Sequence, residues 1–393
     1  MAEMLIGKRE RMSWIQEATS VDTGTATSTS AGKLVETGQN FETTVTVRDI
    51  VHNTTDDTYT IVTAIDSDTT LSLQNDIMVD EDTFVIYDRT WGTGGTMTGG
   101  QVVGYDCTIT PNFSKTYIET LSAGADARTI AAQTKSAESL NYTMMFVPYS
   151  WHVLLYMFNI VDSGSTPTYT HTCSVGNELD SFILEWARQH TTDHVITLLG
   201  NVIKSMTIAF SKPSEGSREG NINISLDCVA KSASAAASVT TLTGGNPSAA
   251  PFQFRNVKLT LGGSEIVEVN GGEMTISNGV NEADSRYANS TLDMAMGEPI
   301  PTVHRVSGRF NVNLKDSTFF DHWETEAAVS GTCKLEFIQA AATDKVVFTF
   351  TDFFLHQGVA PTTIDGVTNV DLIWVANSVA PVVTDAIASY EMK

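Results

Sequence analysis

Residues Thr192 to Ser205 read TDHVITLLGNVIKS, and residues Thr343 to His356 read TDKVVFTFTDFFLH. Both stretches begin with Thr-Asp, a basic or imidazole residue and two β-branched apolar residues, and they align without a gap. β-branched residues are enriched in β-strands, because the branched side chain packs well on a pleated surface. The pair therefore predicts two equivalent strands, one in each half of the chain.

The repeat extends on both sides of these stretches. Three further pairs of segments recur in the same order: Leu184–Trp186 with Leu335–Phe337, Ile224–Ser232 with Val370–Ser378, and, with one residue skipped, Gly104–Thr110 with Gly272–Ser277. Alternating strands resemble one another, so a single match would carry little weight. Four matches in one order indicate an internal duplication of a β-rich domain, and such a repeat sets the whole fold.

Length and composition fit an all-β protein. The chain of 393 residues allows two or three domains, and Thr, Ser, Val and Gly are abundant. The formal net charge is −23. Tight binding to a phosphate backbone requires clustered Lys and Arg, so this charge argues against a nucleic-acid-binding protein. It favours solubility and repulsion of nucleic acid instead.

The distribution of apolar residues predicts neither export nor membrane insertion. The first residues have no apolar core long enough for a signal peptide, and the densest apolar run, Trp151–Val161, is too short to span a bilayer. We therefore expect a soluble protein made in a cytoplasm. The cysteines are far apart and form no CxxC pair, which predicts buried free thiols at Cys107, Cys173, Cys228 and Cys333.

Residues 25–90 have the pattern of a self-contained small β unit. Short alternating strands, such as Tyr59–Ile65, are separated by polar turns, such as Asn53–Asp57. The acidic turns lack the Gly and the downstream Glu of a calcium-binding EF-hand loop. We interpret this unit as a module inserted into the first copy of the repeat.

The chain thus divides into six parts. The predicted boundaries are 1–24 for an N-terminal arm of the first copy, 25–90 for the inserted module, 91–232 for the first copy, 233–250 for a Ser/Ala/Gly-rich linker, 251–380 for the second copy and 381–393 for a C-terminal tail. Each copy is expected to carry one short helix. The first covers Trp151–Phe158 after Ser150, and the second covers Phe319–Ala327 after Asp316.

Nucleotide and hydrolase motifs are missing from the sequence. The Gly24…Gly32-Lys33 spacing is wrong for a phosphate-binding loop, and no helix follows Trp91–Gly95 to hold a pyrophosphate. There is no Gly-x-Ser-x-Gly elbow and no His-Glu-x-x-His pair.

Four residue pairs come nearest to a site, and each has a simpler structural interpretation. The pairs are His171 with Cys173, His190 with His194, Asp193 with Asp344, and Glu185 with Glu336. A metal site needs a second matching pair, and duplicated residues at equivalent positions need no catalytic role. We therefore assign no catalytic, cofactor-binding or metal-binding residue and expect no enzyme activity.

One copy runs as strand, long loop, strand, short helix and three strands. With the duplication, this pattern resembles the tail tube proteins of tailed phages and related viruses. The likeness is closest in Phe252–Ile276 and Val306–Trp323. It implies two tandem β-sandwich or barrel domains, each with a short flanking helix, in an all-β fold with minor α.

The resemblance also implies a function in the virion. Tail tube subunits form rings whose sheets join edge to edge around a lumen, through which viral DNA passes without specific binding. Partners would be further copies of the chain, the tape measure protein, the tail terminator or neck proteins, and the baseplate. The long loops Ser114–Ser139 and Asn281–Pro301 would be the arms that contact the adjacent ring. Because each chain carries two copies, we expect trimeric, pseudo-hexameric rings.

Two other classes of protein share some of these features. A virion decoration protein or a carbohydrate-binding adhesin is also β-rich, acidic and often duplicated, but an adhesin would carry a secretion signal. A β-rich hydrolase would need a pair of carboxylates, and the duplication explains the equivalent positions of Glu185 and Glu336 without catalysis. The tail tube remains the preferred interpretation.

Overall fold

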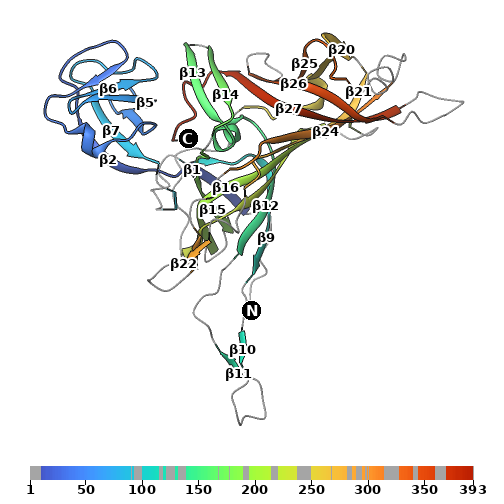
Figure 1. Cartoon of the computed structure of the whole chain (residues 1–393), viewed down its shortest axis with the longest axis horizontal. Helices are drawn as coiled ribbons and strands as arrows, with labels where there is room; N and C mark the ends of the chain where they lie inside the picture. Colours follow the sequence, from blue (N-terminus) through green and yellow to red (C-terminus); the bar gives the residue numbers. More distant parts are fainter. Residues whose placement is uncertain are drawn as a thin grey trace, which may run out of the picture.

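A computed structural model gives the fold (Figure 1). It describes residues 10–392 except 90, 93–99, 115–117, 121–128, 132–138, 167, 177, 189–193, 214–219, 237–248, 267, 281–285, 289–293, 297–298, 300, 314–326, 340–343 and 359–368. The regular elements of this part are strands, apart from α1 (Phe41–Thr44) and two short 3₁₀ helices, His152–Tyr156 and Phe254–Asn256. The predicted all-β fold with minor α is confirmed.

The inserted module is a small sheet with its own core. Its strands, in the order β2-β7-β4-β5-β6-β3, are β2 (Thr19–Thr25), β7 (Thr83–Asp88), β4 (Ile50–Asn53), β5 (Thr58–Ser67), β6 (Thr70–Leu73) and β3 (Lys33–Val35). Leu34, Phe41 and Phe84 are among the residues of a hydrophobic cluster separate from the rest of the protein. Since β2 pairs with β7 from Thr19 onwards, the module's sheet begins earlier than the predicted residue 25.

The remaining large strands form one continuous sheet system. The first half contributes β1 (Glu10–Gln16), β8 (Gln101–Val102), β9 (Tyr105–Ser114), β12 (Ser139–Val147), β13 (Asn159–Ser165), β14 (Thr168–Ser174), β15 (Phe182–Arg188), β16 (His194–Ser211), β17 (Asn223–Val229) and β18 (Ser232–Ala236). The second half contributes β19 (Val257–Leu261), β20 (Ser264–Ile266), β21 (Val269–Ser277), β24 (Arg305–Asn313), β25 (Cys333–Ile338), β26 (Lys345–Gly358) and β27 (Asn369–Asp385).

The two halves have the same order of hydrogen-bonded strands. In the first half it is β9-β12-β17-β16-β15, and in the second half it is β21-β24-β27-β26-β25. All of these pairings are antiparallel. The two stretches quoted first contribute His194–Ser205 to β16 and Lys345–His356 to β26, at the same position in this order. The repeat in the sequence is thus a repeat of strand topology.

The position of the module follows from the same comparison. In the second half, β19 pairs with β25 and forms a hairpin with β20, closed by Gly262 and Gly263. Both glycines have positive φ, +60° and +82°, as a two-residue hairpin turn requires. In the first half, β1 pairs with β15 and with β8, and the module stands between β1 and β8. The module therefore occupies the place of a two-residue turn.

The halves do not have separate cores. A single hydrophobic cluster runs through both of them. Trp151, from the 3₁₀ region of the first half, packs with ring centroids 5.4, 5.5 and 5.7 Å from Phe252, Phe337 and Phe348 of the second. Because every side chain of His152–Tyr156 is buried, this short 3₁₀ turn fills the core where the sequence predicted a helix. The second predicted helix, up to residue 326, lies outside the described residues.

Two predicted non-sheet segments contain strands. Residues 232–236, which cross the predicted boundary between the first copy and the linker, form β18 and pair with β16 from Val195 to Leu199. β27 continues to Asp385, inside the predicted C-terminal tail, and the following Tyr390 is fully buried. In both cases an available strand edge recruits a segment whose composition alone does not indicate a strand.

Candidate assembly surfaces

The two halves join along a seam between β16 and β21. Seven residue pairs form it, from Ser205 opposite Ser277 to Ser211 opposite Gly271. The hydroxyl groups of Thr207 and Thr275 lie 2.9 Å apart across the seam. A Cβ on Gly271 would lie 2.8 Å from the Phe210 carbonyl oxygen, so glycine allows the strands to meet there. The seam is an edge-to-edge contact between two copies of one topology.

The counterparts of the seam strands have open edges. β9, the counterpart of β21, pairs with β12, and no pairing among the described residues uses its other edge. β26, the counterpart of β16, pairs with β27 along its length and with β25 up to Phe350, and the Phe353 carbonyl accepts a hydrogen bond of 2.8 Å from the Val329 N–H. In the described part, that edge of β26 is open from residue 354 to its end. Exposed strand edges are templates for pairing with another chain.

The joined sheet has one covered and one open face. Alternate residues such as Met206, Ile224 and Phe310 are buried in the common core. The residues between them on β12, β16, β17, β21 and β24 are partly or fully exposed. They include Thr143, Thr207, Thr275 and Ser307. We call this second surface the open face. It is rich in hydroxyl and amide groups, whereas β15, β25 and the 3₁₀ region contribute residues to the core behind the covered face.

A shallow hollow marks the open face where the halves meet. Its volume is about 430 Å³, and Ser211, Asn223, Glu273, Arg309, Asn311 and Asp371 are among its lining residues. Arg309 Nε lies 3.2 Å from Glu273 Oε1, and Asn311 donates a hydrogen bond of 2.8 Å to Asp371. The charged groups of the hollow are therefore partnered across neighbouring strands.

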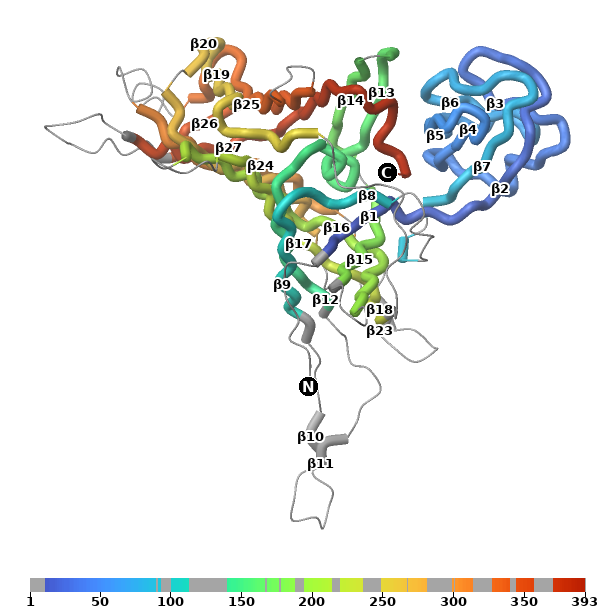
Figure 2. Tube along the Cα trace, turned by 180° about the vertical axis from the view of Figure 1, so that it is seen from behind, coloured from blue at the N-terminus to red at the C-terminus, as the bar shows by residue number. Residues whose placement is uncertain are grey.

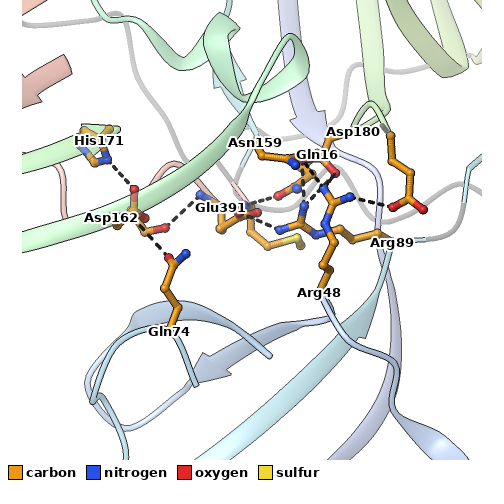
Figure 3. A network of polar contacts seen from close by, with 12 residues as sticks. Gln16, Arg48, Gln74, Arg89, Asn159, Asp162, His171, Asp180 and Glu391 are labelled. Atoms are coloured by element: carbon orange, nitrogen blue, oxygen red, sulfur yellow. Dashed lines mark hydrogen bonds and ion pairs between the residues drawn. The ribbon is translucent and has the colours of Figure 1, made fainter. Parts of the chain in front are cut away.

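The module is fixed to the first half by two arginines (Figure 3). Arg89 donates two hydrogen bonds to Asp180, at 2.8 and 2.9 Å, and one of 2.8 Å to Glu391. Burial lowers the pKa of Arg89, but the two carboxylates outweigh it and leave the pKa above its ordinary value. Burial also raises the pKa of Glu391, which Arg89 opposes. These paired groups join the module's exit, the first half and the C-terminus.

The second arginine extends from the module itself. Arg48 donates hydrogen bonds to Glu178 at 2.6 Å and to Asn159 at 3.0 Å. The backbone N–H of Asp162 donates to Gln74 of the module at 3.4 Å. The module thus contacts the base of β13 and the segment before β15, on the elements that cover the core and not on the open face (Figures 1 and 3).

A buried histidine lies next to this junction. The ring of His171 on β14 is 2.6 Å from Asp162 and 3.1 Å from Asp385, at the end of β27. Tyr390 stacks on the ring at 4.1 Å and donates a hydrogen bond to Asp385. Burial lowers the pKa of His171, but the two carboxylates outweigh it and raise the pKa to about 9. This charged cluster ties the two halves together beside the β14–β27 pairing.

The structure places the residues singled out in the sequence at ordinary structural positions. Cys173 is buried beside His171, and the described residues contain no group of three or more His, Cys, Asp or Glu arranged to hold a metal ion. Glu185 and Glu336 lie on β15 and β25, and the carboxylate of Glu336 is 2.6 Å from Lys334.

The remaining singled-out residues are turn and strand positions. His194 begins β16, and the carbonyl of Asp344, just before β26, accepts a hydrogen bond from the Gln339 N–H. Gly24 lies in β2, and Lys33 in β3 pairs with Asp66 at 2.8 Å, so they form no phosphate loop. His190, Asp193 and most of the Trp91–Gly95 run lie outside the described residues.

Both predicted arms contain a short described hairpin. β10 (Ile118–Thr120) pairs with β11 (Thr129–Ala131) within Ser114–Ser139, and β22 (Arg286–Ala288) pairs with β23 (Met294–Met296) within Asn281–Pro301. β9 and β12, which come before and after the first arm, extend away from β13 and β14 (Figures 1 and 2). No helix among the described residues is long and apolar enough to cross a membrane.

Comparison with known proteins identifies the family. A family model described as Phage tail tube protein matches residues 86–378, well over half of the chain. The chain belongs to the phage tail tube protein family. The resemblance seen in the sequence is confirmed, and this family membership makes the chain a structural component of the phage virion tail. Comparison with individually curated proteins gave no match.

The family match begins at residue 86, after almost all of the module. The tail tube pattern therefore belongs to the duplicated part. Sequence reasoning missed the residues that fix the module, namely Arg48, Arg89, Asp180, Glu391 and Asp162. The only signal was that Arg48 and Arg89, with Lys33, are the sole basic residues between positions 19 and 89.

Proposed function

We propose that the chain polymerises into stacked rings that form the conduit for viral DNA, each ring being a trimer with pseudo-sixfold symmetry. The intrachain seam between β16 and β21 carries the proposal. At this seam one tail tube unit joins the next edge to edge. The corresponding strands β26 and β9 have open edges in the described part of the sheet.

Ring closure follows from these two ends. The β26 edge of one chain differs from the β9 edge, so the contact is heterologous and closes only at a fixed number of units. Closure also removes every unpaired edge. Relatives with one unit per chain would need six chains, whereas this chain supplies two units. Three chains then give the same circumference, with seams within and between chains alternating around the ring.

The open face is proposed to line the lumen and the module to lie outside. The covering layer on the other face needs the larger circumference, and the module contacts that layer through Asn159, Glu178 and Asp180. An exterior module would leave the lumen free for DNA. The domain division, with residues 91–232 and 251–380 as the two tube domains, belongs to this proposal.

The remaining assignments rest on the family. The Ser114–Ser139 and Asn281–Pro301 hairpins are proposed to contact the adjacent ring. The tape measure protein inside the lumen, the terminator or neck proteins at one end and the baseplate at the other are the proposed further partners. The protein would be made in the host cytoplasm before it joins the virion tail.

Cross-linking and end-on electron microscopy test the ring together. With Cys107 replaced by Ser, cysteines at Thr108 or Thr110 of β9 are mixed with chains carrying cysteines at Phe354 or His356 of β26. At least one mixture should give disulfide-linked chains, and a Thr207→Cys/Thr275→Cys chain is the intrachain control. Averaged end-on views should show three chains per ring. Six chains per ring, with only one half lining the lumen, would refute the trimer.

A further inference from the structure

The same sheet surface is covered in the first half and open in the second. Strands β1, β15 and the start of β16 correspond to β19, β25 and the start of β26. One side of each set packs into the common core, and we call the opposite side the outer surface. In the first half, Ser13, Ile183 and Val195 on the outer surface are only 1%, 1% and 2% exposed. Other parts of the chain therefore already cover the outer surface there.

Lysines stand at the three corresponding positions of the second half, Lys258, Lys334 and Lys345. The strand register gives this correspondence through opposed residues: Ser13 opposite Glu185 matches Lys258 opposite Glu336, Ile15 opposite Ile183 matches Thr260 opposite Lys334, and Ala187 opposite Val195 matches Ile338 opposite Lys345. The side chains of Lys258 and Lys334 are 48% and 34% exposed, and Lys345 is exposed as well. The outer surface of the second half is thus open and carries lysines where the first half buries uncharged residues.

Nearby carboxylates compensate only part of this positive charge. Lys334 Nζ lies 2.6 Å from Glu336 Oε1, and Lys258 Nζ lies 3.6 Å from Glu265 Oε2. Lys345 has no ion-pair partner among the residues that the structure describes. Exposed cations that lack a partner within the chain attract acidic groups of another molecule. The outer surface of the second half can therefore receive an acidic partner.

A hollow beside these lysines gives the surface a shape that a partner can enter. Its volume is about 460 Å³, and its lining residues include Arg255, Lys258, Ile266 and Ile338. Arg255 belongs to the 3₁₀ turn just before β19 and is exposed, so it adds a further cation to the same region. Apolar and basic groups thus lie side by side at the edge of the outer surface.

The module carries the opposite charge. Residues 19–88 contain 13 Asp and Glu against 2 Lys and Arg, a net charge of −11 within the −23 of the whole chain. Both bases already lie beside carboxylates, Lys33 beside Asp66 and Arg48 beside Glu178. Surfaces of opposite charge steer their encounter and select which surfaces pair. The exposed acids of the module include Asp56, Asp57, Asp68, Asp76, Asp80 and Glu81.

The module extends towards the place that a neighbouring chain would occupy. Figures 1 and 2 show the module and the strands β20 and β25 at opposite ends of the longest axis, with the first half between them. In the proposed ring, the first half has its own second half on one side and the second half of the next chain on the other. The module therefore lies on the side of the neighbour's lysines, away from those of its own chain.

We propose that the acidic module of one chain docks on the outer surface of the second half of the neighbouring chain, where Lys258, Lys334 and Lys345 receive it. This rests on the proposed function, because the ring sets which chain lies beside the module. The open strand edges close the ring without this contact. Docking of the module therefore strengthens the ring and makes its stability depend on salt, since exposed ion pairs are screened.

Zero-length cross-linking of assembled tubes tests the contact directly. A carbodiimide joins a lysine amine to a carboxylate that touches it, with no spacer. Tubes are assembled at low salt from equal amounts of ¹⁵N-labelled and unlabelled full-length chains, cross-linked and analysed by mass spectrometry. Links from Lys258, Lys334 or Lys345 to acids of residues 19–88 should include pairs that combine the two isotopes, which come from different chains. Tubes that give no such mixed pairs would overturn the docking.

Charge reversal measures what the contact contributes. Lys258→Glu with Lys345→Glu should raise the protein concentration needed for half-assembly roughly fivefold at low salt, the factor expected for one or two exposed ion pairs. The difference from the unmodified chain should shrink as salt is added. Lys212→Glu with Arg305→Glu makes the same change in net charge at other exposed positions and should have a much smaller effect.

A compensating change distinguishes the contact from a general loss of stability. Lysines placed at the module acids that were cross-linked, in the same chain as Lys258→Glu and Lys345→Glu, should restore assembly. Equal effects of the two reversed pairs, or no recovery with the compensating lysines, would contradict the docking. Circular dichroism verifies folding, and Lys258→Gln with Lys345→Gln serves if the reversed variant does not fold.

Tube formation by the unmodified chain is scored separately by electron microscopy. A folded chain that never forms tubes contradicts the proposed function. Tubes without mixed-isotope links between the module and the lysines contradict only the docking of the module.

Discussion

At the scale of single residues, His171 makes the stability of the protein depend on pH. Its folded pKa of about 9 exceeds its ordinary value of 6.5 because Asp162 and Asp385 stabilise the charged ring. A raised folded pKa contributes stability that is fully present below about pH 6.5 and is lost as the pH rises through 9. The contribution is on the order of 3 kcal/mol. The groups facing the ring are these two carboxylates and Tyr390, which burial keeps protonated.

The prediction compares His171→Gln with His52→Gln across this range. His171→Gln should lower the free energy of unfolding most at pH 6 to 7, and the difference from the unmodified chain should shrink towards pH 10. His52 Nε2 lies 3.0 Å from Asp57, whose side chain is 85% exposed. His52→Gln should therefore change the free energy of unfolding much less. Denaturant titrations at several pH values measure both. A difference for His171→Gln that stays constant with pH would contradict the charged-ring account.

At the scale of elements, the hairpin comparison predicts how the module can be removed. Residues 17–98 stand where the second half has only Gly262-Gly263, so Gln16 joined to Gly99 through two glycines should reproduce the β19–β20 turn. The module has its own core, and its loss leaves the common core intact. We expect the shortened chain to fold and to form tubes, as seen by electron microscopy.

Removing the module also removes Arg89. The buried carboxylates Asp180 and Glu391 then lose their partner, and breaking a buried ion pair typically costs about 3 to 5 kcal/mol. Asp180→Asn with Glu391→Gln should recover most of that loss in the shortened chain, but should destabilise the full-length chain. Thermal melting measures these changes in stability for the full-length and shortened chains, each with and without the double substitution. Failure of the corrected, folded chain to form tubes would place the module in an essential assembly contact.

At the scale of the whole molecule, we expect the seam within the chain to be stronger than the proposed seams between chains. Within the chain, the halves share a core, the β14–β27 pairing and the C-terminal contacts of Tyr390 and Glu391. Between chains, the open β9 and β26 edges are the proposed joint. We predict that rising guanidinium concentration separates tubes into folded chains before it unfolds them.

Light scattering and far-UV circular dichroism distinguish these two events. Loss of scattering should precede loss of β-sheet signal, and its midpoint should rise with protein concentration because association follows mass action. The unfolding midpoint of the separated chain should not depend on concentration. Coincident transitions at every protein concentration would show that the halves and the chains are joined equally strongly.

The sequence by itself determined the repeated strand topology. Alternation and β-branching are local properties, and they are present in each copy, so Thr192–Ser205 and Thr343–His356 were recognisable as equivalent strands before any contact was known. The same local signals separated the module, because its strands alternate and are bounded by their own turns. The family followed from the order of these segments.

Only the tertiary structure decided what joins these segments. β18 is a strand because β16 offers it an edge, and Trp151, just before the short 3₁₀ turn, packs against aromatic residues of the other half. The His171 cluster brings together residues up to 214 positions apart. Pair formation and burial of charge depend on which distant surfaces meet, and no local pattern records that. For the same reason the seam became visible only in the folded chain.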